Sequence, residues 1–118
     1  MLDKQEAQKI AQEWIDAWND HDIDKIMIHY EDDVQFISPI IVELLGDEAG
    51  KIKGKEKVRD YFLKGLQTCP NLTFKLLEFL TGINSLVIYY INYKGTQTAE
   101  YMEISYSGKI QKVVAHYS

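Results

Sequence analysis

The sequence has a single cysteine and no long hydrophobic run, and both shortages exclude classes of protein. Cys69 cannot form a disulfide within the chain or build a zinc site from several cysteines. The longest uncharged apolar run, residues 86–91, is far shorter than a membrane-spanning helix requires. The first residues are charged and lack the apolar segment of a secretion signal. We therefore expect a soluble, cytoplasmic protein that makes no membrane contact.

Basic residues are fewer than acidic ones. The 118 residues include 13 Lys and Arg against 18 Asp and Glu, which gives a net charge of −5. A chain of negative charge does not attract phosphate backbones, so nucleic acid is not an expected partner. Hydrophobic residues make up 46% and charged residues 26%, a balance typical of a folded domain. The length predicts one domain over residues 1–118.

The spacing of apolar residues changes from a helical period to a strand period along the chain. It predicts helices over residues 7–18, over 23–30 and from Gly54 to the residues before Pro70. A turn at 31–33 and a strand at 34–38 follow the second helix, whereas segment 40–52 has no clear pattern. Strands are then predicted at 73–80, 86–93, 96–106 and 109–117, separated by short turns such as Lys94-Gly95.

Short links between strands favour antiparallel pairing, because parallel pairs need long crossovers. Helices that precede strands in one small domain predict an α+β fold, with three N-terminal helices packed on one sheet face.

Several short motifs occur in a fixed order along nearly the whole chain. They are EWIDAWNDHD at 13–22, HYEDDV at 29–34, GKEKVRDYF at 54–62, and EYMEI at 100–104 followed by GKI at 108–110. In this order they resemble the NTF2-like superfamily, in particular its SnoaL-like and ketosteroid-isomerase-like branches. The resemblance implies a cone in which a curved antiparallel sheet encloses an apolar cavity, and pairing of two copies through the outer sheet face. The fold alone does not fix an activity, because members include isomerases, cyclases, dehydratases and transport factors.

The first candidate for a catalytic residue is Glu100, on the penultimate predicted strand. The resemblance implies that a carboxylic acid at this position faces the cavity. Loss of solvent there would raise the pKa of the carboxyl and keep it protonated. Alternation along the strands then predicts which neighbours share its face. The predicted inward residues are Met102, Ile104, Val87, Tyr89, Ile91, Val113, Ala115 and Tyr117, and the predicted outward residues are Ile88, Tyr90, Tyr101, Glu103 and His116.

The alternative to this assignment of inward and outward residues is a strand register shifted by one residue. It would turn Glu103 and His116 inward together, where they could act as an acid–base pair. His29 is a weaker candidate for a general base that reaches the cavity, and a plain surface position is the other interpretation of this residue. The three histidines lack the spacing of a metal site, and no phosphate-binding glycine motif is present, so no metal and no cofactor are expected.

Two positions depart from the ketosteroid isomerase pattern. Trp14 stands where the resemblance implies a tyrosine that donates to an oxyanion, and Ser38 stands where it implies an aspartate base. An indole N–H can donate a hydrogen bond but cannot exchange a proton as a phenol does. A lone serine is a poor base near neutral pH. Ketosteroid isomerase activity itself is therefore not expected.

Aromatic side chains with a few polar tips are typical of small-ligand pockets. We predict binding of a small, largely apolar or aromatic molecule, with acid–base catalysis of the isomerase, cyclase or dehydratase type. A non-catalytic carrier, or a dimeric interaction module with a filled core, are the alternatives. The apolar outer sheet face predicts a homodimer. The predicted ligand-binding residues are Trp14, Trp18, Tyr30, Phe36, Ser38, Phe62, Tyr89, Met102 and Tyr117.

Overall fold

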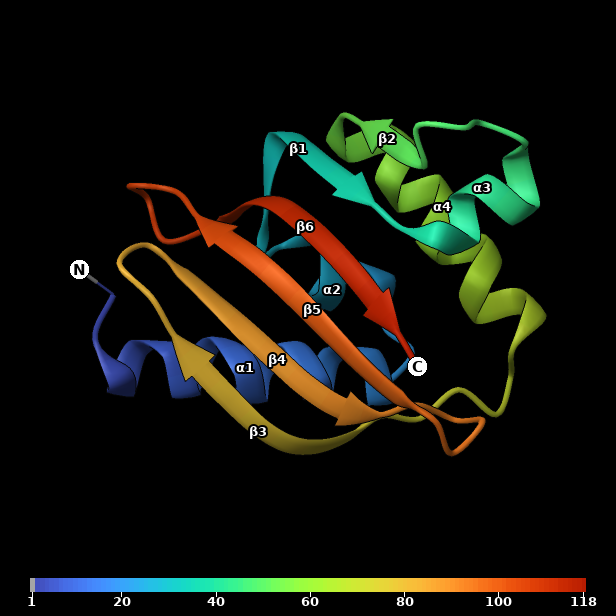
Figure 1. Cartoon of the computed structure of the whole chain (residues 1–118). Coiled ribbons are helices and arrows are strands. Elements are labelled where there is room, and N and C mark those ends of the chain that lie inside the picture. Colours follow the sequence, from blue (N-terminus) through green and yellow to red (C-terminus); the bar gives the residue numbers. More distant parts are fainter. Residues whose placement is uncertain (1) are drawn as a thin grey trace.

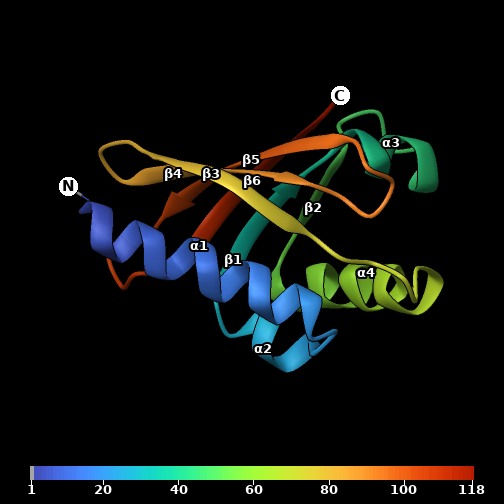
Figure 2. The same ribbon diagram turned by 90° about the horizontal axis from the view of Figure 1, so that it is seen from below.

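One mixed β-sheet, covered by helices on one side, forms the framework of the protein. The computed structural model describes residues 2–118. In chain order the elements are α1 (Lys4–Asn19), α2 (Ile23–Met27), β1 (Tyr30–Ile37), α3 (Pro39–Leu45), β2 (Lys51–Lys53), α4 (Lys55–Thr68), β3 (Lys75–Thr81), β4 (Ser85–Ile91), β5 (Gln97–Ile104) and β6 (Ile110–Tyr117). Helices α1, α2 and α4 lie against the same face of the sheet, and α3 follows the end of β1 at one end of the sheet (Figures 1 and 2). The predicted α+β fold is confirmed.

The strand order is β2-β1-β6-β5-β4-β3. Strands β3 to β6 form the predicted antiparallel meander. Strand β1 pairs with β6 in parallel, so the prediction of a wholly antiparallel sheet is wrong. The long stretch of chain between these two strands makes the parallel pair possible, since it includes two helices and serves as the crossover.

Strand β1 also begins earlier than predicted. Tyr30 pairs with Ile110 and Gln35 pairs with Lys112, so more residues of β1 than of β6 lie between these pairs. The acidic segment 31–33 is therefore part of an irregularity within the strand, of the kind a β-bulge makes, and not the predicted turn.

Local capping explains where α1 begins and where α3 begins and ends. The Asp3 side chain accepts a hydrogen bond from the Glu6 backbone N–H at 2.9 Å and starts α1. Ser38 caps α3, Pro39 occupies its first turn, and Gly46 ends it at a φ of 68°. This fourth helix lies in the segment that had no clear pattern, whereas three helices were predicted. Among residues 2–118, no helix combines the length and apolar character that a membrane crossing requires.

The amide side chain of Asn19 attaches the end of α1 to the chain that leads into β3. It donates to the Phe74 carbonyl oxygen at 2.9 Å and accepts from the Phe74 backbone N–H at 2.7 Å. These two bonds fix the end of α1, and with it Trp14 and Trp18, relative to the sheet. The buried side of α1 consists of Ala7, Ala11, Trp14, Ile15, Ala17 and Trp18.

The register between β4 and β5 decides which side chains face the helices. Ile88 lies opposite Glu100, and residues directly opposite each other share a face of the sheet. Ile88 and Tyr90 are therefore buried under the helices, and Tyr89 lies on the outer face, the reverse of the prediction. The loop between β4 and β5 causes this reversal. The prediction had a two-residue turn at Lys94-Gly95, whereas the loop spans residues 92–96 and Ile91 is the residue that pairs with Gln97. Such a change of one residue in register reverses every side chain of a strand.

Candidate functional site

Aromatic rings fill much of the space between α1, α4 and the inner sheet face. The ring centroids of Phe74 and Tyr90 are 4.4 Å apart, and Trp14 stacks on Phe74 at 5.6 Å. Trp18 meets the edge of Phe62 at 4.9 Å. A polar atom in such surroundings has lost its water and needs a partner inside the protein.

Glu100 is the buried carboxyl of this interior. It is 5% exposed, and its Oε2 accepts a hydrogen bond of 2.6 Å from the Tyr90 hydroxyl. Burial raises the pKa of Glu100 to about 7, although the bond from Tyr90 works in the opposite direction. Burial and the nearby carboxylate raise the pKa of Tyr90 well above its usual value. The carboxyl therefore changes protonation near neutral pH while its tyrosine partner stays neutral, which suits proton transfer.

A second buried pair lies beside the first. The Trp14 indole Nε1 donates to the Tyr30 hydroxyl oxygen at 2.9 Å, and both side chains are buried. Burial raises the pKa of Tyr30, and the charge of Glu100 raises it further. Tyr30 is therefore a neutral hydroxyl close enough to Glu100 to sense its charge. The N–H of Trp14, the residue at the position of the isomerase tyrosine, is already used within the protein.

Tyr117 and Ser38 lie at the rim of this interior. Tyr117 ends β6 and is 39% exposed, yet burial and the charge of Glu100 raise its pKa. The Ser38 side-chain oxygen accepts from the Ile40 backbone N–H at 3.2 Å, so it is occupied as a helix cap. Tyr117 therefore connects the surroundings of Glu100 to the surface of the molecule.

The structure brings most of the predicted ligand-binding residues to the helix-covered side. Tyr89 is the exception, because the register of β4 places it on the outer face. Tyr90, which was expected on the outer face, takes its place and donates a hydrogen bond to Glu100. The length of the 92–96 loop was the signal that could have revealed this exchange. The predicted residues that are buried on the inner side are Trp14, Trp18, Tyr30, Phe36, Phe62 and Met102.

The alternative pair of Glu103 and His116 is not assembled. Glu103 pairs with Lys112 and His116 pairs with Ala99, so the two residues lie apart along the outer face. Glu103 accepts from the Tyr101 hydroxyl at 3.2 Å, and His116 is exposed. The shifted register on which this pair depended is not adopted.

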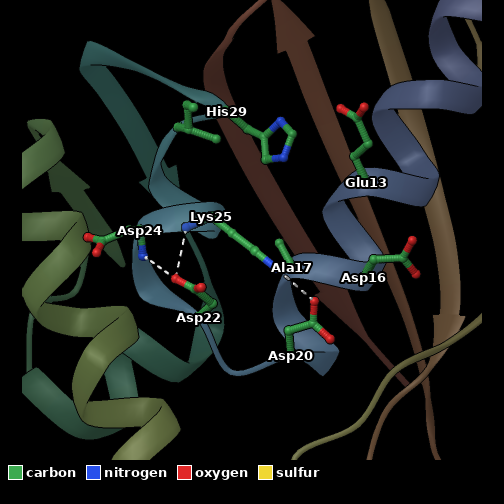
Figure 3. A pocket seen from close by; sticks show the side chains of 9 residues that line it. Glu13, Asp16, Ala17, Asp20, Asp22, Asp24, Lys25 and His29 are labelled. Atoms are coloured by element: carbon green, nitrogen blue, oxygen red, sulfur yellow. Dashed lines mark hydrogen bonds and ion pairs between the residues drawn. The ribbon is translucent and has the colours of Figure 1, made fainter.

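His29 belongs to a different place on the molecule. It lines an open hollow of about 530 Å³ between α1 and α2, together with Glu13, Asp16, Ala17, Asp20, Asp22, Asp24, Lys25 and Ile28 (Figure 3). Burial lowers the pKa of His29, and the charge of Glu13 opposes this effect. Glu100 does not line the hollow, so the structure does not bring His29 to the buried carboxyl.

A second open hollow, of about 630 Å³, lies at the start of α4 and is lined mostly by charged residues between Lys53 and Arg59. It too lies outside the aromatic interior. Residues 2–118 contain no group of three or more His, Cys, Asp or Glu side chains that could hold a metal ion.

Comparisons with known proteins agree with this architecture. The SnoaL-like domain family matches residues 11–117. A SnoaL-like protein of unknown function from Burkholderia thailandensis is 37% identical, with 99% of this chain and 98% of that one covered and a TM-score of 0.97. No curated protein matches the chain significantly.

Two more distant structures share the fold. A candidate isomerase of the SnoaL-like family from Agrobacterium tumefaciens is 15% identical, covers 97% of this chain and 98% of its own, and has a TM-score of 0.77. A candidate ketosteroid isomerase from Kribbella flavida is 16% identical, with coverages of 100% and 82% and a TM-score of 0.75. The resemblance inferred from the motifs is thus confirmed, and the chain belongs to the SnoaL-like domain family.

Proposed function

We propose that the protein binds a small, largely apolar or aromatic molecule on the helix-covered side of its sheet, and that Glu100 exchanges a proton with it. The observation that carries this proposal is the buried carboxyl with a pKa of about 7, held at 2.6 Å by the Tyr90 hydroxyl. Burial of an ionisable carboxyl among aromatic rings opposes folding, so stability alone does not account for it. A role in proton transfer does.

The arrangement suits proton transfer within one ligand molecule. As a carboxylate, Glu100 can remove a hydrogen from the carbon next to a carbonyl group. The protonated carboxyl can then return this proton to the same ligand at another atom, so the reaction needs no cofactor. The bond from Tyr90 to Oε2 fixes the orientation of the carboxyl and leaves Oε1 to carry the proton.

The experiment measures the exchange of the α-hydrogens of 1-indanone, an apolar aromatic ketone, in heavy water by proton NMR. We expect the wild-type protein to accelerate this exchange and Glu100→Gln to reduce the acceleration by about 10²–10⁴-fold, the usual contribution of a general base. Glu103→Gln, on the outer face of the same strand, is the matched control and should retain the wild-type rate. Equal exchange rates for wild type and Glu100→Gln would remove Glu100 from the reaction.

A dimeric interaction module with a filled interior is the second candidate. It is favoured by the close packing of rings around Glu100 and by the position of both hollows outside that interior. Native mass spectrometry of freshly purified protein separates the two candidates. A retained small molecule supports the first, whereas a clean protein that also fails to bind 1-indanone supports the second.

We also propose that two copies pair through the outer sheet face. That face presents Val87, Tyr89 and Ile91 from β4 next to Tyr101 and Val114, and all five side chains are only half-buried in one chain. An apolar face of this kind favours burial against a second copy.

A charge in the middle of this face is expected to separate the two copies. Val87→Glu should convert the dimer to a monomer in light scattering coupled to size-exclusion chromatography, because a carboxylate cannot be buried there without a partner. Tyr106→Glu, in the exposed turn between β5 and β6, is the control and should leave the dimer intact. A wild-type protein that is monomeric at micromolar concentration would contradict the proposed pairing.

A further inference from the structure

A line of polar side chains connects the loop between β4 and β5 to the buried carboxyl of Glu100. Thr98 lies two residues before Glu100 on β5 and is 1% exposed. Tyr90 lies directly opposite Thr98 across the two strands. Asn92 follows two residues after Tyr90 and begins the loop that joins the strands (Figure 1). A threonine hydroxyl that is buried so completely needs polar partners inside the protein.

The side-chain amide of Asn92 has a fixed orientation. Its Oδ1 accepts from the Lys94 backbone N–H at 3.0 Å and from the Thr96 backbone N–H at 3.3 Å. A backbone N–H only donates, so the amide oxygen must be the atom that faces these two groups. The amide nitrogen, Nδ2, then donates to the Thr98 Oγ1 at 2.9 Å. The conformation of the loop therefore decides that Thr98 meets a donor.

The direction that is set at Asn92 continues to the carboxyl. Because the Thr98 Oγ1 accepts from Asn92, the hydroxyl hydrogen of Thr98 is available for another acceptor. A hydrogen bond from the Thr98 side chain opposes the rise in the pKa of Tyr90, which is the effect of a donor on a phenol oxygen. The Tyr90 hydroxyl donates in turn to Oε2 of Glu100 at 2.6 Å. Hydrogen bonds that run in one direction strengthen one another, and here all of them run toward Glu100.

Glu100 is the group of this interior that titrates near neutral pH. The titratable side chains that sense its charge are Tyr30 of β1, Tyr90 of β4 and Tyr117 of β6, and burial raises the pKa of each. Burial also raises the pKa of Tyr61 of α4, which lies near Tyr117. The buried residues of α1 and α4 are all apolar or aromatic. The four tyrosines therefore stay neutral while the carboxyl ionises, and its titration reports on its hydrogen bonds.

We propose that Thr98 and Asn92 are positioning residues for Glu100, and that a one-way chain of hydrogen bonds anchored in the 92–96 loop holds the Tyr90 hydroxyl as a donor to the carboxyl. This inference rests on the proposed function and extends it to two residues that take no part in the proton transfer itself. A donor that Thr98 strengthens favours the carboxylate, which is the form that removes a hydrogen from the ligand. The chain therefore sets how much of Glu100 is ionised near neutral pH.

The first measurement is a titration of Glu100 by ¹³C NMR in protein labelled at the glutamate side-chain carboxyl carbons, with Glu100→Gln to identify the signal. Thr98→Val replaces the hydroxyl by a methyl group of similar size. We expect it to raise the midpoint, which is about pH 7 in the wild type, by about 0.5 pH, because a weaker donor favours the carboxylate less. Thr98→Ser keeps the hydroxyl and should restore the wild-type midpoint. Thr96→Val is the matched control, because its hydroxyl donates to the Asn92 Oδ1 from outside the chain of bonds, and it should not move the midpoint.

Asn92→Ala tests the first bond of the chain. It should move the midpoint in the same direction as Thr98→Val, because the Thr98 hydroxyl can then turn away from Tyr90. In the double variant the midpoint should equal that of Thr98→Val alone, since Asn92 acts only through Thr98. Effects that add in the double variant would overturn the chain. Asn92 is only partly buried, so this variant also provides the test if Thr98→Val does not fold.

The second measurement is the pH dependence of the exchange of the α-hydrogens of 1-indanone. Below the midpoint of Glu100 the rate follows the ionised fraction of the carboxyl, so Thr98→Val should lower it about threefold at about pH 6. At about pH 9 the carboxyl is ionised in both proteins, and the rate should not fall. A residue with a merely structural role would lower the rate at every pH.

The titration uses no ligand, so failure of this inference can be distinguished from failure of the proposed function. An unchanged midpoint in Thr98→Val, in a protein whose exchange activity depends on Glu100, overturns the chain and leaves the proposed function standing. A raised midpoint that Thr98→Ser does not restore also overturns it, because the hydroxyl is then not the cause. If the wild-type protein does not accelerate the exchange, the proposed function fails, and the positioning role fails with it.

Discussion

Replacement of Phe62 by alanine is expected to lower the free energy of unfolding by about 3–5 kcal/mol, the range found for large aromatic truncations in cores. Phe62 lies in the buried stripe of α4 and is 4% exposed. Its ring contacts Trp18 at 4.9 Å, Phe36 at 5.1 Å and Tyr30 at 5.7 Å between centroids. The loss would remove a large part of the roughly 5–15 kcal/mol that stabilises a typical domain.

Urea unfolding followed by tryptophan fluorescence measures this loss. The urea concentration at the midpoint should fall, and the dependence of the free energy of unfolding on urea concentration should not change. Tyr106→Ala is the control, because Tyr106 is fully exposed and its truncation should change stability by at most about 0.5 kcal/mol. A loss below about 1 kcal/mol in Phe62→Ala would contradict the close packing of rings around this side chain.

The elements that the sequence predicted well are those with a signal within a few residues. The stripe of α1 and its Asp3 cap are local features, and so are Gly54 before α4 and Pro70 after it. Helix α3 was missed because its apolar residues show no sustained period, and its cap at Ser38 was considered only as a position in a family pattern. The parallel pairing of β1 with β6 depends on contacts between distant parts of the chain, which local pattern does not encode.

The candidate site shows the same difference between what local pattern predicts and what depends on contacts between distant parts of the chain. The inward orientation of Glu100 was predicted from the resemblance, and the structure has it buried. Its partner was not predicted, because the choice between Tyr89 and Tyr90 depends on one residue in the 92–96 loop. The raised pKa of Glu100 was likewise expected from its inward position, because loss of solvent disfavours the charged form of a carboxyl. The Tyr90 hydrogen bond that opposes this shift was not expected, because it depends on the register of β4.

The wild-type protein is expected to lose stability as the pH rises through about 7, and Glu100 is the cause. Its pKa is about 7 in the folded protein against a reference value of 4.5. Between these values the folded state keeps a proton that the unfolded state has released, so a rise in pH favours unfolding. The stabilisation from the protonated carboxyl is complete below the lower value and is lost above the higher one. The difference amounts to about 3 kcal/mol, since each pKa unit corresponds to about 1.4 kcal/mol.

Glu100→Gln isolates this contribution, because glutamine stays neutral and its carbonyl oxygen can still accept from the Tyr90 hydroxyl. Urea unfolding at about pH 5 and about pH 8 should show that the variant gains about 2–3 kcal/mol relative to wild type between the two conditions, because a small part of the stabilisation is already lost at pH 5. Glu103→Gln, on the outer face, should follow the wild-type pH dependence. A constant difference between wild type and Glu100→Gln at both pH values would mean that the buried carboxyl ionises as an exposed one does. The proposed proton exchange would then lose the observation that carries it, because a Glu100 that is fully ionised near neutral pH does not have the raised pKa of a buried carboxyl.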